Sequence, residues 1–223
     1  MILTDRQPGS PLYKVWFYEL VRTAVLLAFK VAFRARGFDR KNVPAKGPVL
    51  LASNHESFLD PPTIAILLHH RHLEFVARAS LFKGFFGHII KALNAIPLKD
   101  DGGDAAAIKE VLRRLESGRA VLIFPEGSRS PDGEMKEFKR GVALLVKKAQ
   151  CPIVPVAIAG AFEHWPVGGK CRFLGPSVRV KYGRPIAHEE LMKNGADAAL
   201  ERLRAEVARL REELHALKQR TAR

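Results

Sequence analysis

Short apolar runs alternate with amphipathic segments through the middle of the chain. The runs are bounded by turn-forming residues, as expected of strands, and helical periodicity separates most of them. The predicted strands are Val49–Ala52, Leu73–Ala77, Ala95–Leu98, Ala120–Phe124, Ile153–Ala159 and Val178–Tyr182. The predicted helices between them are Pro61–His70, Asp104–Ser117 and Lys139–Ala149. This order predicts a single α/β domain with a largely parallel sheet covered by helices on both faces.

The N-terminal stretch Leu12–Phe33 has the pattern of an amphipathic helix. A charge-free arc is formed by Phe17, Leu20, Val21, Ala24, Leu27, Ala28 and Val31. Aromatic residues cluster at the start of this helix, and basic residues follow its end. Such a helix suits an anionic membrane interface, although a first helix packed on the core is the alternative.

The C-terminal stretch Ala196–Arg220 is also predicted to be an amphipathic helix. Its apolar residues alternate at steps of three and four, which is the seam of a coiled coil; they are Leu200, Leu203, Val207, Leu210, Leu214 and Leu217. The seam is shorter than the roughly three to four heptads expected of a zipper. Docking on its own domain is therefore at least as well supported as a homodimer.

Charge and cysteine content narrow the function classes. The net charge of +14 favours polyanionic partners, namely nucleic acid, anionic lipid or phosphorylated substrates. The basic residues are spread along the chain without a nucleic-acid-binding module, so we expect no nucleic acid. Two cysteines give no disulfide framework and fit a reducing cytosol. We find no signal peptide and no apolar stretch near the roughly 18 residues of a spanning helix.

His55 and Asp60 lie on either side of a turn that leads into a predicted helix. Asp60 precedes Pro61 and Pro62, which is typical of an N-cap followed by proline in the first turn. The turn can bring the imidazole to the carboxylate, which would fix the tautomer while the other ring nitrogen accepts a proton. This pair is a candidate general base; the alternative is a helix cap beside an ordinary turn histidine.

A second polar cluster, residues 124–130, follows the predicted strand Ala120–Phe124. Ligands bind at strand ends in α/β sheets. Gly127 allows close approach of the backbone to a ligand, and the guanidinium of Arg129 matches phosphate oxygens. Further positive charge comes from Lys136, Lys139 and Arg140. The alternative is a solvated turn in which Glu126 pairs with Arg129.

No sequence motif indicates a metal or a bound cofactor. His69, His70 and His72 come at the end of a predicted helix, where positive charge is favourable without a metal. The glycine pairs of the chain fit neither the dinucleotide nor the P-loop fingerprint. We therefore expect no metal and no cofactor.

Two segments resemble blocks of the glycerolipid acyltransferase family, which includes lysophosphatidic acid acyltransferases. Residues 54–60, Asn-His-Glu-Ser-Phe-Leu-Asp, resemble the first block, and residues 124–130, Phe-Pro-Glu-Gly-Ser-Arg-Ser, resemble the third. Residues 154–158 are similar to the fourth block. The resemblance implies an acyltransferase domain at 43–187, between a membrane-associating segment at 1–42 and a C-terminal helix at 188–223.

The resemblance also implies an activity and a set of site residues. The activity is transfer of an acyl group from acyl-CoA or acyl carrier protein to the 2-hydroxyl of 1-acylglycerol 3-phosphate. His55 would be the base and Asp60 its partner, and we expect direct transfer without an acyl-enzyme. The residues expected to bind substrate near the third block are Glu126, Gly127, Ser128, Arg129 and Lys139. Asn54 and Pro155 are expected to shape the site.

One departure from the family pattern concerns the second block. That block commonly ends with an arginine after a short apolar strand, whereas Ala95–Leu98 continues into Lys99. Lysine supplies a point charge instead of a bidentate fork. We expect Lys99 and Arg78 to bind substrate, with Lys83 as additional charge, and the acceptor head group stays open.

These expectations define the partners and the rival functions. The expected partners are a lysophospholipid, an acyl donor and an anionic membrane surface, with acyl carrier protein as one candidate donor. Another lysophospholipid or an amino-acid-containing lyso-lipid is the alternative acceptor, and a non-catalytic lipid-binding scaffold is the rival of another class. The expected location is the cytoplasmic face of a membrane, in peripheral or monotopic contact.

Overall fold

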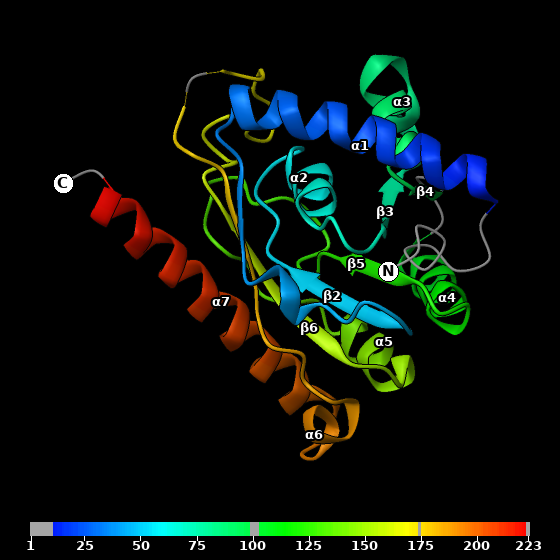
Figure 1. The fold of residues 1–223 in the computed structure, drawn as a ribbon. Helices are drawn as coiled ribbons and strands as arrows, with labels where there is room; N and C mark the ends of the chain where they lie inside the picture. Colours follow the sequence, from blue (N-terminus) through cyan, green and yellow to red (C-terminus); the bar gives the residue numbers. More distant parts are fainter. Residues whose placement is uncertain (1–10, 99–102, 174, 222–223) are drawn as a thin grey trace.

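The computed structural model describes residues 11–98, 103–173 and 175–221, which form a seven-stranded sheet between two layers of helices (Figure 1). The strands are β1 (Arg36–Phe38), β2 (Val49–Ser53), β3 (Leu73–Arg78), β4 (Ala95–Leu98), β5 (Ala120–Ile123), β6 (Ile153–Ala159) and β7 (Arg179–Tyr182). The helices are α1 (Leu12–Ala32), α2 (Asp60–Leu67), α3 (Gly84–Ala92), α4 (Gly103–Glu116), α5 (Gly141–Ala149), α6 (His188–Met192) and α7 (Ala196–Thr221), with short 3-10 helices η2 (Arg40–Asn42) and η3 (Ala79–Phe82).

The sheet has the order β1-β7-β6-β2-β5-β3-β4. Every neighbouring pair is parallel except β6 and β7. The predicted α/β fold with a largely parallel sheet is therefore confirmed, and all six predicted strands are present. Sequence periodicity missed β1, α3 and α6, because β1 and α6 are very short and α3 has two glycines in its first turn.

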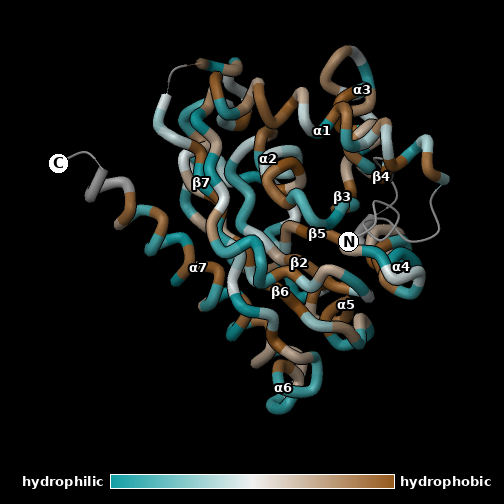
Figure 2. The backbone as a smooth tube through the Cα atoms, viewed as in Figure 1, coloured by the Kyte–Doolittle hydropathy of each residue, from teal (hydrophilic) through white to brown (hydrophobic). Residues whose placement is uncertain are grey.

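Strand β2 shows how the sheet separates two cores. Leu50 and Ala52 pack with residues of α4, α5 and α7, whereas Val49 and Leu51 pack with residues of α1 and α2. This alternation is the period of two expected of a strand buried on both faces. Hydrophobic residues follow β5 and β6 along the centre of the molecule in Figure 2.

Helix α1 is fixed to the domain by a buried polar contact. Tyr18 stacks on the imidazole of His72 at 3.7 Å, and His72 Nε2 lies 2.7 Å from Glu19 Oε1. Arg22 bonds the same glutamate and donates to the carbonyl of Ile66 in α2. One face of α1 thus packs on the core, as the alternative interpretation of this helix required.

Most of the predicted charge-free arc of α1 faces away from that contact, whereas Val21 of the arc packs against the core. Phe17, Leu20, Leu27 and Val31 are between 57% and 82% exposed. The helix therefore has two apolar faces, one docked and one open. Within the described ranges, no helix is both long and apolar enough to cross a bilayer.

Helix α7 packs along the sheet of its own domain, next to β6 and α5 (Figure 1). Five residues of the predicted seam are buried: Leu200, Leu203, Val207, Leu210 and Leu214. The seam is therefore used within the chain, which is the docking alternative to a zipper.

Candidate active site

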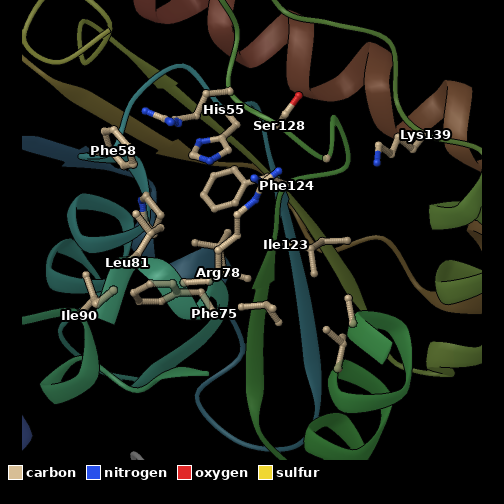
Figure 3. A pocket seen from close by; sticks show the side chains of 18 of the residues that line it. His55, Phe58, Phe75, Arg78, Leu81, Ile90, Ile123, Phe124, Ser128 and Lys139 are labelled. Atoms are coloured by element: carbon tan, nitrogen blue, oxygen red, sulfur yellow. The ribbon is translucent and has the colours of Figure 1, made fainter. Parts of the chain in front are cut away.

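The carboxyl ends of β2, β3 and β5 border a cavity of about 790 Å³. Of the residues predicted to form the site, His55, Arg78, Gly127, Ser128, Arg129 and Lys139 line it. Figure 3 shows His55 and Ser128 at one end of this cavity and Phe75 and Ile90 toward the other. The strand ends therefore bring the two polar clusters of the sequence to one place.

The imidazole of His55 is bonded to Asp60. His55 Nδ1 lies 2.8 Å from Asp60 Oδ2, and the same oxygen accepts the backbone N–H groups of Glu56 at 2.6 Å and Ser57 at 2.7 Å. These donors hold the carboxylate and with it the ring. Nε2 is left as the nitrogen that can exchange a proton with a ligand.

Asp60 differs in one respect from the sequence prediction. It is the first residue of α2, and Leu59 occupies the N-cap position. The next two residues are Pro61 and Pro62, which carry no N–H group for a cap to accept. The carboxylate is therefore available to the turn before the helix, where it binds the imidazole and two backbone N–H groups.

Burial sets the protonation of the pair. Burial, together with the positive charges of Arg129 and Lys136, lowers the pKa of His55 to about 3. The imidazole is thus neutral in the free protein, which is the form that accepts a proton. Burial raises the pKa of Asp60, while the N–H groups of Ser57 and Glu56 lower it by binding the ionised form.

Arg129 is the positively charged residue of this cavity that is best suited to bind a phosphate. Its guanidinium lies over the ring of Phe58, 3.3 Å from the centroid. Among the described residues, its Nη1 has no hydrogen-bond partner although it is buried. A guanidinium held by an aromatic ring with a free donor is suited to bind an oxyanion.

A family model described as Acyltransferase matches residues 36–159, more than half of the chain. The chain belongs to the acyltransferase family. It is 30% identical to a 1-acyl-sn-glycerol-3-phosphate acyltransferase of Pseudomonas aeruginosa over 190 residues, covering 82% of this chain and 71% of the relative. It is 28% identical to a chloroplastic protein of the same name from Arabidopsis thaliana over 172 residues, 75% of this chain and 46% of the relative.

A solved acyltransferase has the same fold. The 1-acyl-sn-glycerophosphate acyltransferase PlsC of Thermotoga maritima superposes with a TM-score of 0.77 at 26% identity, covering 91% of this chain and 81% of that one. The chain spans just under half the length of the chloroplastic relatives from Arabidopsis thaliana and Brassica napus.

Four described residues predicted for the acyltransferase site do not line the cavity: Asn54, Asp60, Glu126 and Pro155. Asn54 exchanges two hydrogen bonds with the backbone of Ile158 in β6. Pro155 lies in β6 beside Gly183, on the side that faces Leu210 of α7. The remaining prediction, Lys99, falls outside the described residues.

Glu126 is enclosed between two backbone segments. Its Oε1 accepts the N–H of His55 at 2.9 Å and its Oε2 accepts the N–H of Lys136 at 3.2 Å. Its oxygens are thus bonded to the backbone instead of to Arg129, unlike the solvated ion pair considered from the sequence. Burial raises the pKa of Glu126 to about 7, against the lowering effect of these two N–H groups.

Two positions of the third block lie against lysine side chains. Gly127 has a φ of +71°, and a side chain there would collide with the side chain of Lys139. Ser128 accepts a hydrogen bond from Lys136 Nζ. The side chains of Lys136 and Lys139 therefore lie next to this loop, and the backbone at Gly127 has a conformation that only glycine adopts without strain.

Aromatic residues of the site were not identified from the sequence. Phe124 stacks on the ring of His55 at 4.0 Å, and Phe58 packs against Trp165 and Phe86. Phe58 and Phe124 lie inside the two motifs, so their positions in the sequence could have identified them. Trp165 follows β6 in an irregular segment, and no sequence pattern identified it.

The three clustered histidines point to different partners. His69 lies beside Arg40, His70 beside the carbonyl of Val43, and His72 beside Glu19. Within the part of the chain that the structure describes, no three histidine, cysteine or acidic side chains are grouped to hold a metal ion.

Proposed function

We propose that this acyltransferase moves a fatty acyl group from an acyl thioester to the 2-hydroxyl of 1-acylglycerol 3-phosphate, giving phosphatidic acid. The observation that carries the proposal is the His55–Asp60 pair at the edge of a cavity that also contains Arg129. The names of the relatives support the same acceptor.

In this mechanism His55 is the general base. Its Nε2 takes the proton of the acceptor hydroxyl as that oxygen bonds to the thioester carbonyl carbon. The carbon–sulfur bond then breaks, and the departing thiolate receives the proton from the imidazolium. Asp60 keeps Nδ1 as the donor and stabilises the imidazolium while it exists.

Substrate recognition would divide between the two ends of the cavity. Arg129 and Arg78 supply positive charge for the phosphate, beside the base. Away from the base the lining is apolar on both sides of the sheet. Phe75, Leu81 and Ile90 lie on the side of α2, and Ile108, Val111 and Leu145 lie on the side of α4 and α5. Apolar walls of this kind suit acyl chains, because burying each methylene contributes about 0.8 kcal/mol.

The test is acyl transfer from labelled acyl-CoA and acyl carrier protein to a panel of lyso-lipids in vesicles. Wild-type protein should label phosphatidic acid, and His55→Ala should lose roughly a hundred- to ten-thousandfold in rate. His69→Ala, which removes an exposed histidine at the end of α2, is the matched control. Turnover only on another lyso-lipid would change the acceptor, whereas equal rates for wild type and His55→Ala would favour a scaffold.

We further propose that the open face of α1 contacts an anionic membrane at its cytoplasmic face. Two exposed phenylalanines extend this surface: Phe173 stacks on Phe33 just after α1, and Phe85 lies in α3, which packs beside α1. The segments that carry these phenylalanines are residues 79–90 and 165–173. They contain Lys83, Lys170 and Arg172 and no acidic residue. Apolar and basic side chains together suit an anionic interface.

Vesicle sedimentation tests this surface. Replacing Phe17 and Leu20 by serine should weaken binding to anionic vesicles at least tenfold, since each buried side chain contributes about 1.5–3 kcal/mol. Leu144→Ser removes a half-exposed leucine on α5, across the sheet from α1, and should leave binding unchanged. Equal losses in both proteins would contradict a specific role of α1.

A further inference from the structure

Glu126 joins the third-block loop to the residue that carries the base. Glu126 is only 3% exposed, and it is not one of the described residues that line the cavity. One carboxylate oxygen accepts the N–H of His55 and the other accepts the N–H of Lys136. The side chain thus bridges two stretches of backbone that neither strand nor helix pairing connects.

The same loop holds His55 at two further points. The N–H of Ser130 donates to the carbonyl of His55 at 2.7 Å. The ring of Phe124 lies against the imidazole, with 23° between the planes. Asp60 fixes one ring nitrogen, but the backbone and one ring face of His55 are set by residues 124–130.

We propose that Glu126 is a positioning residue that holds His55 in place for catalysis, and not a ligand of the glycerol phosphate. This inference rests on the proposed acyl transfer, and it differs from the role that the family resemblance implies. Each carboxylate oxygen already accepts a backbone N–H, and the side chain is closed off from the cavity. A carboxylate beside a phosphate would also be repelled by it, whereas Arg129 in the same loop attracts it.

Two variants separate positioning from binding. Glu126→Ala removes both acceptors, whereas Glu126→Gln keeps one amide oxygen for one of the two N–H groups. We expect kcat to fall about a hundredfold in Glu126→Ala and less in Glu126→Gln, because small displacements of a reacting group are costly. The KM for the lyso-lipid should stay within about twofold of wild type. Glu137→Gln, an exposed glutamate of the same segment, is the matched control.

The imidazole nitrogen resonances of His55 give a readout independent of turnover. In wild type they should report one tautomer with the proton on Nδ1, and Glu126→Gln should broaden or shift them while Glu137→Gln does not. A raised lyso-lipid KM with unchanged kcat and unchanged resonances would overturn the proposal, as would no effect of either substitution. If wild type transfers to no acceptor, the proposed function fails, and the resonances still decide whether Glu126 holds His55.

Discussion

Replacing Asn54 by alanine is expected to destabilise the protein by about 2–6 kcal/mol. The last paired residue of β2 is Ser53, opposite Val156. Beyond it, Asn54 Oδ1 accepts the N–H of Ile158 and Nδ2 donates to its carbonyl, both at 2.9 Å. The amide therefore takes the place of a peptide group and continues the ladder by one step. Asn54 is 2% exposed, so alanine would leave two buried backbone groups unpaired.

Urea unfolding followed by circular dichroism measures this change. The midpoint should fall by roughly 0.7–2 M if the slope is about 3 kcal/mol per molar and stays unchanged. Ser53→Ala is the matched control, because the buried hydroxyl of Ser53 has no hydrogen-bond partner among the described residues. It should be neutral or slightly stabilising. An Asn54→Ala protein within about 0.5 kcal/mol of wild type would show that the side chain does not carry the strand pairing.

Three other substitutions test separate parts of the site. Gly127→Ala should lower stability by about 1–2 kcal/mol, because its φ of +71° disfavours a side chain. It should also lower kcat/KM, because the end of the Lys139 side chain, which lines the cavity, must move aside; a fully active, equally stable variant would contradict this. Phe58→Ala should raise the lyso-lipid KM about threefold or more by releasing Arg129, and an unchanged KM would count against a phosphate role for that arginine. Burial raises the pKa of Glu56 to about 8, so the folded state binds its proton more tightly and stability should fall as pH rises from about 4.5 to 8. Melting curves of Glu56→Gln should depend less on pH, and parallel curves would refute the assignment.

The sequence was sufficient to predict the fold and to select several residues, His55 and Arg129 among them, that line one cavity; their roles stay predictions. Period-two and helical patterns located six strands, because each is buried on at least one face. The spacing of His55 and Asp60 was informative because Pro61 and Pro62 mark the start of a helix at Asp60. Arg129 was selected because it follows a buried strand, where ligands bind in α/β sheets, and a surface ion pair with Glu126 was the alternative.

The partners of other residues could not be predicted from the sequence. Glu126 and Asn54 bind backbone groups, and no side-chain pattern reveals which N–H or carbonyl lies opposite. Because Pro61 and Pro62 have no N–H groups, Asp60 binds the turn before the helix and does not cap the helix. Helix α1 has apolar residues on both its docked and its open side, so periodicity alone did not show which side faces the core.

The pairing of β1 with β7 has a consequence for the order of folding. Arg36 lies opposite Arg179, so the edge next to α1 is completed by one of the last strands to be made. Such long-range parallel contacts form slowly, because a long loop must close first. During synthesis α1 therefore emerges with its apolar surface long before the sheet behind it is whole. A ribosome-bound chain that has not reached β7 would present this helix to chaperones or to a bilayer as an exposed hydrophobic segment.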